Sequence, residues 1–250
     1  MKNLLFTYTL FLIFNFSFAQ TKTDLTEAGL KGKVSFISSS EFSLVEKFGE
    51  IEKGSLSSKY TDKYDAKGNQ IEGNNYNADG SLSSKETYKY DAKGNQIEEN
   101  IYNADGSLAF KNTSMYDEKG NEIEVDIYNA DGSLEFKCNY KYDEKGNKIE
   151  WNNYNDDGSL SPKETYKYDE KGNKIEENIY NDDGSLAFKT TYKYDEKGNK
   201  IESNKYNADG SLSPKYTITY KYDTMGNWIK KTNIKDGKPT QLSERVIEYY

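Results

Sequence analysis

Apolar and polar residues alternate along most of this chain, in arms of about nine residues separated by clusters of Gly, Asn and Asp. The arms are rich in Tyr, Ile, Thr and Phe, and such a pattern between turn residues is typical of β-strands. A long run of these arms predicts an all-β fold.

The turn clusters recur at a fixed interval. The triplet Lys-Gly-Asn begins, at intervals of 26 residues, at Lys67, Lys93, Lys119, Lys145, Lys171 and Lys197, and Met225-Gly226-Asn227 follows at an interval of 28. Between the triplets lies Asn-Ala-Asp-Gly-Ser or Asn-Asp-Asp-Gly-Ser. Both clusters place a residue that tolerates positive φ where a tight hairpin needs one. Each unit is therefore predicted to be an antiparallel β-hairpin.

The division of side chains between two faces tests this register. A two-residue loop at Lys93-Gly94 sets Tyr90 opposite Ile97, and a similar loop in the second cluster sets Ile101 opposite Leu108. Because side chains alternate along a strand, one face is then apolar and the other polar. The apolar set is Leu82, Tyr88, Tyr90, Ile97, Ile101, Leu108 and Phe110, and the polar set is Lys85, Thr87, Lys89, Glu98, Asn100 and Tyr102.

Residues nine apart vary together between units. The pairs are Ile101–Phe110, Ile127–Phe136, Ile179–Phe188, Asn75–Ser84, Asn153–Pro162 and Lys205–Pro214. A diagonal contact across the hairpin would couple such residues. Duplication of a two-unit block would give part of the same pattern.

Seven hairpins predict about 14 strands in one meander, and open sheets rarely exceed about 10 strands without curling. We therefore expect tandem 26-residue antiparallel β-hairpin repeats in a long meander, forming a curled or superhelical single-sheet ribbon with its apolar face on the concave side. The expected divisions are an N-terminal cap segment at 20–54 with a degenerate turn at Lys53-Gly54, a seven-copy repeat array at 55–227, and C-terminal cap strands at 228–250.

Residues 1–19 have the layout of a secretory signal peptide: a positive start at Lys2, an apolar run from Leu4 to Phe16, and small residues at Ser17 and Ala19. A retained anchor would need about 20 apolar residues, and this run is shorter. We expect an exported bacterial protein, periplasmic or extracellular, with no membrane span after signal cleavage.

Composition limits the chemistry. The net charge is −8 at pH 7, and binding of phosphate backbones relies on Lys and Arg, so no nucleic-acid partner is expected. The sequence has no His, which removes Ser-His-Asp and Cys-His catalysis and imidazole metal sites. Cys138 stands where other units have Glu, Asn or Thr, and acids such as Asp91 recur as turn residues. We expect a non-enzyme without cofactor or metal.

One tyrosine per unit falls on the polar face, and these six residues are called the Tyr stripe: Tyr76, Tyr102, Tyr128, Tyr154, Tyr180 and Tyr206. A line of exposed rings beside amides and charges could stack on sugars or contact a protein. The same line could instead be a structural ladder that packs across strands. The Tyr stripe is the candidate binding site.

The pattern Tyr-x-Tyr-Asp-x-x-Gly-Asn, as at 88–95, resembles the tyrosine-aspartate (YD) repeats of Rhs-type bacterial proteins. The resemblance covers about 56–227, with Asn in place of the usual Arg after the Gly. The ending, 226–232 and 244–250, looks like the close of short secreted members. Large members wind such hairpins into a shell around a toxin, and this chain has too few repeats for that function to be carried over.

These observations predict a secreted, non-enzymatic β-repeat protein with an extended binding or scaffolding surface at the cell envelope. One alternative is a structural or shielding element of a larger assembly. Another is a carbohydrate-binding repeat module. The partner is unknown from sequence, and a cell-surface polysaccharide or an envelope protein would each fit.

Overall fold

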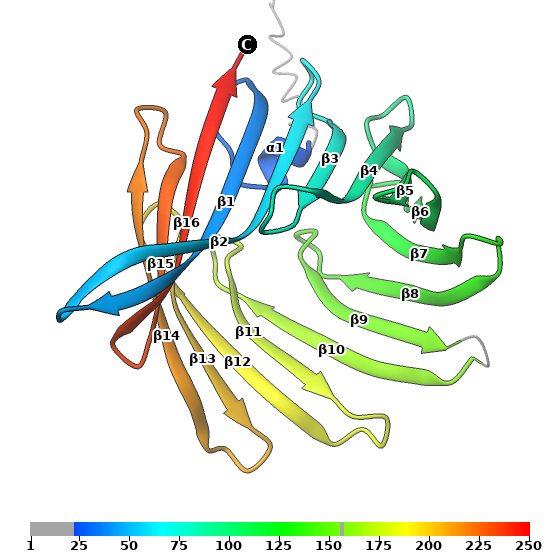
Figure 1. The fold of residues 1–250 in the computed structure, drawn as a ribbon. Coiled ribbons are helices and arrows are strands. Elements are labelled where there is room, and N and C mark those ends of the chain that lie inside the picture. The colour runs from blue at the N-terminus through cyan, green and yellow to red at the C-terminus, as the bar shows by residue number, and fades with distance from the viewer. Residues whose placement is uncertain (1–22, 156–157) are drawn as a thin grey trace, which may run out of the picture.

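The computed structural model describes residues 23–155 and 158–250, so the predicted signal peptide lies outside the described residues. The described part has one short helix and sixteen strands (Figure 1). The elements are α1 (Asp24–Glu27), β1 (Val34–Lys47), β2 (Glu50–Tyr64), β3 (Gln70–Tyr76), β4 (Leu82–Tyr90), β5 (Gln96–Asn103), β6 (Leu108–Tyr116), β7 (Glu122–Asn129), β8 (Leu134–Tyr142), β9 (Lys148–Asn155), β10 (Leu160–Tyr168), β11 (Lys174–Tyr180), β12 (Leu186–Tyr194), β13 (Lys200–Asn207), β14 (Leu212–Tyr222), β15 (Trp228–Lys235) and β16 (Lys238–Tyr249).

The strands pair in sequence order, and the sheet closes because β1 pairs with β16. Ile37 lies opposite Ile247, and Ser39 lies opposite Arg245. Figure 1 shows β1 in blue beside β16 in red. The open ribbon predicted from the sequence is therefore wrong, and the molecule is a closed antiparallel barrel. The two segments expected to be caps supply the closing strands β1 and β16. The backbone N–H and C=O groups of each of these edge strands bond to those of the other.

Among the described turns of the repeats, both kinds are three-residue loops rather than two-residue loops. Asp91 N donates to Asn95 O at 2.9 Å, and Gly94 has a φ of 91°, as a three-residue loop with a bulge requires. The pairing next to the turn shifts by one residue, so Tyr90 lies opposite Gln96 and not Ile97.

The second turn changes the register in a similar way. Ile101 lies opposite Phe110, and Tyr102 lies opposite Leu108, so Leu108 does not belong with the apolar set as predicted. Four covarying pairs lie directly opposite each other instead of diagonally: Asn75–Ser84, Ile101–Phe110, Ile127–Phe136 and Ile179–Phe188. The polar face is confirmed by the pairs Lys85–Tyr102, Thr87–Asn100 and Lys89–Glu98.

The segment 23–33 crosses one end of the barrel. Asp24 Oδ2 accepts hydrogen bonds from Gln70 N and from Tyr90 Oη, each at 2.6 Å. Further along, the backbone of Lys31 bonds to the side chain of Asn227 in the β14–β15 turn. The segment thus reaches from β3–β4 to β14–β15 across the opening of the ring. Because the hydroxyl of Tyr90 bonds to this segment, the wall that carries Tyr90 faces the inside of the ring.

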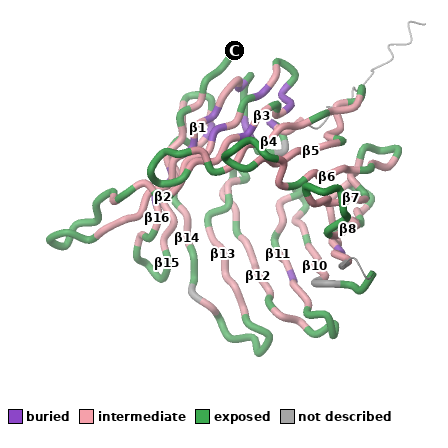
Figure 2. Tube along the Cα trace, turned by 45° about the vertical axis from the view of Figure 1, so that its right-hand side comes forward, coloured by how far each residue is buried: buried purple, intermediate pink, exposed green. Residues whose placement is uncertain are grey.

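The described core is small and lies where this segment meets the closing strands. Leu25 and Leu30 pack with Val34, Ile37 and Tyr64. Figure 2 shows buried positions gathered near β1 and β3, with intermediate burial along most of the repeats. The repeats are therefore held mainly by strand pairing and by side-chain rows on the two walls.

β1 and β2 extend beyond the ring as a long hairpin (Figure 1). Pairing of β1 with β16 stops at Ser43, and pairing of β2 with β3 begins at Lys59. The tip is Phe48-Gly49, both with positive φ. The turn predicted at Lys53-Gly54 is wrong, since these residues lie within β2.

Candidate functional site

Ion pairs repeat along the outer wall. Glu98 contacts Lys89 Nζ at 2.5 Å and Lys111 Nζ at 2.9 Å, and it accepts a hydrogen bond from Asn100 Nδ2 at 2.8 Å. The bonds from Lys111 and Lys89 lower the pKa of Glu98 to about 2. The equivalent glutamates held between two lysines are Glu72, Glu150, Glu176 and Glu202. The charges of this wall are largely satisfied by one another.

The Tyr stripe lies on this outer wall, and its six side chains are half-buried. Tyr102 lies between Lys85 on one neighbouring strand and Leu108 on the other. In the first unit Lys59 Nζ is 5.6 Å from the ring of Tyr76. The rings therefore lie within rows of cross-strand neighbours, and their role in binding stays a prediction.

The inner wall carries a second set of tyrosines. In five units the Tyr directly before the Asp of the Lys-Gly-Asn turn donates its hydroxyl to a backbone carbonyl 20 residues earlier, on the neighbouring strand. These bonds are Tyr90 to Gln70, Tyr116 to Gln96, Tyr142 to Glu122, Tyr168 to Lys148 and Tyr194 to Lys174, at 2.6 to 2.7 Å. Tyr116, Tyr142 and Tyr168, with the turns beside them and with α1, line a cavity of about 690 Å³.

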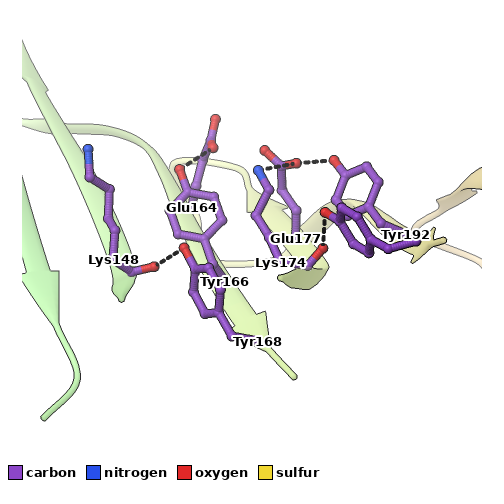
Figure 3. Close-up of polar contacts among 8 residues, drawn as sticks. Lys148, Glu164, Tyr166, Tyr168, Lys174, Glu177 and Tyr192 are labelled. Atoms are coloured by element: carbon purple, nitrogen blue, oxygen red, sulfur yellow. Dashed lines mark hydrogen bonds and ion pairs between the residues drawn. The ribbon is translucent and has the colours of Figure 1, made fainter. Parts of the chain in front are cut away.

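A cluster of charged groups lies on the inner wall of β10 to β12 (Figure 3). Tyr166 Oη donates to Glu164 at 2.7 Å, while Glu177 Oε2 accepts from Tyr192 Oη and pairs with Lys174 at 3.1 Å. Burial and the charge of Glu177 raise the pKa of Glu164. Burial opposes ionisation of Glu177 too, but the bonds from Tyr192 and Lys174 lower its pKa.

An acidic cluster lies further around the same wall. Gln70 Nε2 donates to Asp62 Oδ1 at 2.9 Å, and Tyr88 Oη donates to Glu86 at 2.7 Å. Burial, followed by the charge of Glu86, raises the pKa of Asp62 to about 6. Burial also raises the pKa of Glu99.

Sequence reasoning missed these inner charges because it assigned the acids to turns and to the solvated strand face. A signal was present in the variation between units. On the outer wall the position of Glu98 is Glu in all six units from Glu72 to Glu202. On the inner wall the position of Glu177 is held in the other units by Gly73, Glu99, Val125, Trp151 and Ser203. The units are alike outside and different inside.

Other candidate chemistry is sparse in the part of the chain that the structure describes. No group of three or more Cys, Asp or Glu residues there could hold a metal ion. Cys138 is buried, its Sγ lies 3.6 Å from Asn153 Oδ1, and burial raises the pKa of the thiol. No helix among the described residues is long and apolar enough to span a membrane.

Comparison with known proteins shows a likeness in fold. No family model matches the chain, and no curated protein is similar to it. A porin-like protein from Bacteroides uniformis superposes with a TM-score of 0.60 at 13% identity, covering 87% of this chain and 99% of that one. A porin-like protein from Bacteroides vulgatus gives 0.49 at 13% identity, covering 87% and 98%. At such identities the first match shows a shared fold alone.

Proposed function

We propose that this chain is an exported, non-enzymatic binding protein of the bacterial cell envelope, and that the inner wall of the barrel is its ligand-binding surface. The observation that carries the proposal is the contrast between the walls. The outer wall presents nearly the same residues in each unit, whereas the inner wall has positions, such as that of Glu177, whose residue differs from unit to unit and which can form one asymmetric site.

The chemistry of the inner wall supports binding over catalysis. Glu177 Oε2 already accepts a hydrogen bond from Tyr192 and pairs with Lys174, so its negative charge is compensated within the protein. Half-buried tyrosines with a polar tip are common at binding surfaces. The resemblance to tyrosine-aspartate repeats is kept as a proposal about ancestry.

The predicted signal peptide and the likeness in fold to a porin-like protein support an envelope location. The charged outer wall supports a barrel that stands in water, because a wall facing lipid would carry an apolar band about 25 Å tall. A periplasmic or extracellular site agrees with both features.

The test is retention of purified residues 20–250 on intact cells, isolated envelope polysaccharides and a periplasmic extract. Two matched variants carry three Tyr-to-Ser changes each, one on the inner wall (Tyr140, Tyr166, Tyr192) and one in the Tyr stripe (Tyr128, Tyr154, Tyr180). The proposal predicts that only the inner variant loses retention while both stay folded by circular dichroism. Loss with the stripe variant alone would move the site outside, and no retention by the parent would favour a structural or shielding element.

A further inference from the structure

The charge at one inner-wall position changes around the ring. This position opens each odd-numbered strand from β3 to β13, and it is held in turn by Gln70, Gln96, Glu122, Lys148, Lys174 and Lys200. The three lysines therefore lie two strands apart, about 10 Å from one to the next. They form a regular row on one side of the barrel.

Each of these lysines lies over the ring of an inner tyrosine, at a distance typical of a cation–π contact. The distances from Nζ to the ring centroid are 3.4 Å for Lys148 and Tyr140, 4.8 Å for Lys174 and Tyr166, and 4.6 Å for Lys200 and Tyr192. Figure 3 shows Lys148, Tyr166, Lys174 and Tyr192 projecting from the strands of this part of the wall. The same pair of an amine and an aromatic ring is thus repeated in three successive units.

Lys200 is the least compensated of the three. Lys174 pairs with Glu177, whereas no ion pair joins Lys200 to a carboxylate among the described residues. The Nζ of Lys200 lies over the ring of Tyr192. Burial, and then the charge of Lys174, lower the pKa of Lys200, with a further contribution from Lys231, while the charge of Glu177 acts in the opposite direction. A half-buried cation without a direct ion pair gains most when a ligand brings an anion.

The other side of the inner wall has the opposite charge. Asp62 on β2, Glu86 on β4 and Glu99 on β5 lie there, and burial, followed by the charge of Glu86, raises the pKa of both other carboxyls. An anionic ligand would be repelled from this side and drawn to the lysine row. The lysines of the row therefore lie apart from the acidic cluster, although Glu164 and Glu177 lie beside the row.

We propose that the row of Lys148, Lys174 and Lys200 binds a linear acidic polysaccharide, with carboxylates on the amines and sugar faces on the rings of Tyr140, Tyr166 and Tyr192. The spacing of about two strands is close to the length of two sugar residues, so one carboxylate in every disaccharide would meet each lysine. This inference rests on the proposed function and names the ligand class for the same wall.

The test compares binding of a polygalacturonate oligosaccharide with that of a neutral cello-oligosaccharide of equal length, by calorimetry at low and high salt. The inner variant changes Lys148, Lys174 and Lys200 to Gln. The matched control changes Lys141, Lys167 and Lys193, three outer-wall lysines of the same units, to Gln. Both variants lose the same charge, so only the position of the charge differs.

We expect the acidic oligosaccharide to bind the parent more tightly than the neutral one, and the inner variant to lose about tenfold or more in affinity while the control stays near the parent. Restoring the three charges as Arg should recover binding. Equal binding of both sugars, or equal loss in both variants, would overturn the inference and leave the proposed function standing. Binding of neither sugar by a parent that still retains an envelope protein or a phosphate polymer would also overturn it.

Discussion

The side-chain amide of Asn227 bonds both backbone groups of Lys31: its Oδ1 accepts from Lys31 N, and its Nδ2 donates to Lys31 O, each at 2.8 Å. The hairpin that carries Asn227 has a longer first strand than the repeat hairpins of β4 to β13 before it. Tyr220, and not Tyr222 of the Tyr-Asp motif, makes the bond to the carbonyl 20 residues earlier, at Lys200. The two additional residues of the final 28-residue interval therefore lengthen this hairpin, and its turn reaches the segment that crosses the barrel end.

Replacing Asn227 by Ala should therefore release the segment that crosses the barrel end. We expect a loss of about 2–3 kcal/mol in the free energy of unfolding, because two partly buried hydrogen bonds to the backbone of Lys31 are lost. The matched control is Asn121→Ala, whose side chain bonds within its own turn to Asp117 at 2.9 Å, and it should lose about 1 kcal/mol. Urea unfolding gives both values, and faster hydrogen exchange at the Lys31 amide should accompany the first. Equal losses would contradict this role of the last turn.

The Tyr stripe should contribute to stability. Changing Tyr128, Tyr154 and Tyr180 together to Ser removes three cross-strand neighbours of Leu and Lys, each worth about 0.5–1 kcal/mol. We expect a lower melting temperature with unchanged retention on envelope material. A stable variant that no longer binds would show that the stripe is a binding site.

Met115 interrupts the outer ion-pair rows. It lies opposite Glu124, where Lys89 lies opposite Glu98 in the preceding unit, and its side chain is 53% exposed. Met115→Lys should raise the free energy of unfolding by about 0.2–1 kcal/mol, as exposed pairs do. The gain should disappear in 1 M salt, where screening is strong. A gain that persists in salt would point to removal of the exposed Met side chain instead.

Asp62 should give the barrel a pH dependence of definite sign. Its folded pKa of about 6 lies above the ordinary 3.8, so the folded state binds the proton more tightly than the unfolded state. Stability from this group is present below about pH 4 and is lost as the pH rises to about 6. Asp62→Asn should therefore raise the free energy of unfolding at pH 7 by about 1–2 kcal/mol, after allowance for solvent screening.

The check on Asp62 is urea unfolding of parent and variant at several pH values between 4 and 7. The difference between them should grow across this range and then level off. A constant difference would mean that the charge of Asp62 is not the cause. Because Glu99 is present in both proteins, its own raised pKa cancels in the comparison.

The sequence predicted the hairpins and the polar wall because both depend on local features. Turn residues such as Gly94 and the alternation from Lys85 to Lys89 act within one unit, and the structure confirms them. Closure depends on pairing between Ile37 and Ile247, 210 residues apart, and neither segment carries a local signal for its partner. A meander of hairpins with the same repeat sequence can close into a barrel or stay open.

The inner site was missed for a related reason. Whether Glu164 and Glu177 meet depends on the bulges that set the register of β10 and β11, and a bulge adds a residue without a distinctive sequence. The two-residue loops assumed from Lys-Gly-Asn gave the wrong neighbours beside each turn. Comparing unit with unit, position by position, would have shown that variation gathers on one wall.

Closure of the barrel is the claim on which an inside and an outside depend. Ser38 and Val246 lie opposite each other across β1 and β16, and opposite residues in an antiparallel pair have Cα atoms about 4.5–5.5 Å apart, within reach of a disulfide. The measurement is mild oxidation of Ser38→Cys/Val246→Cys in a chain that also carries Cys138→Thr, followed by mass spectrometry of the monomer. A closed barrel predicts a disulfide within one chain. Free thiols, or disulfides found only between chains, would contradict closure and would support an open ribbon instead.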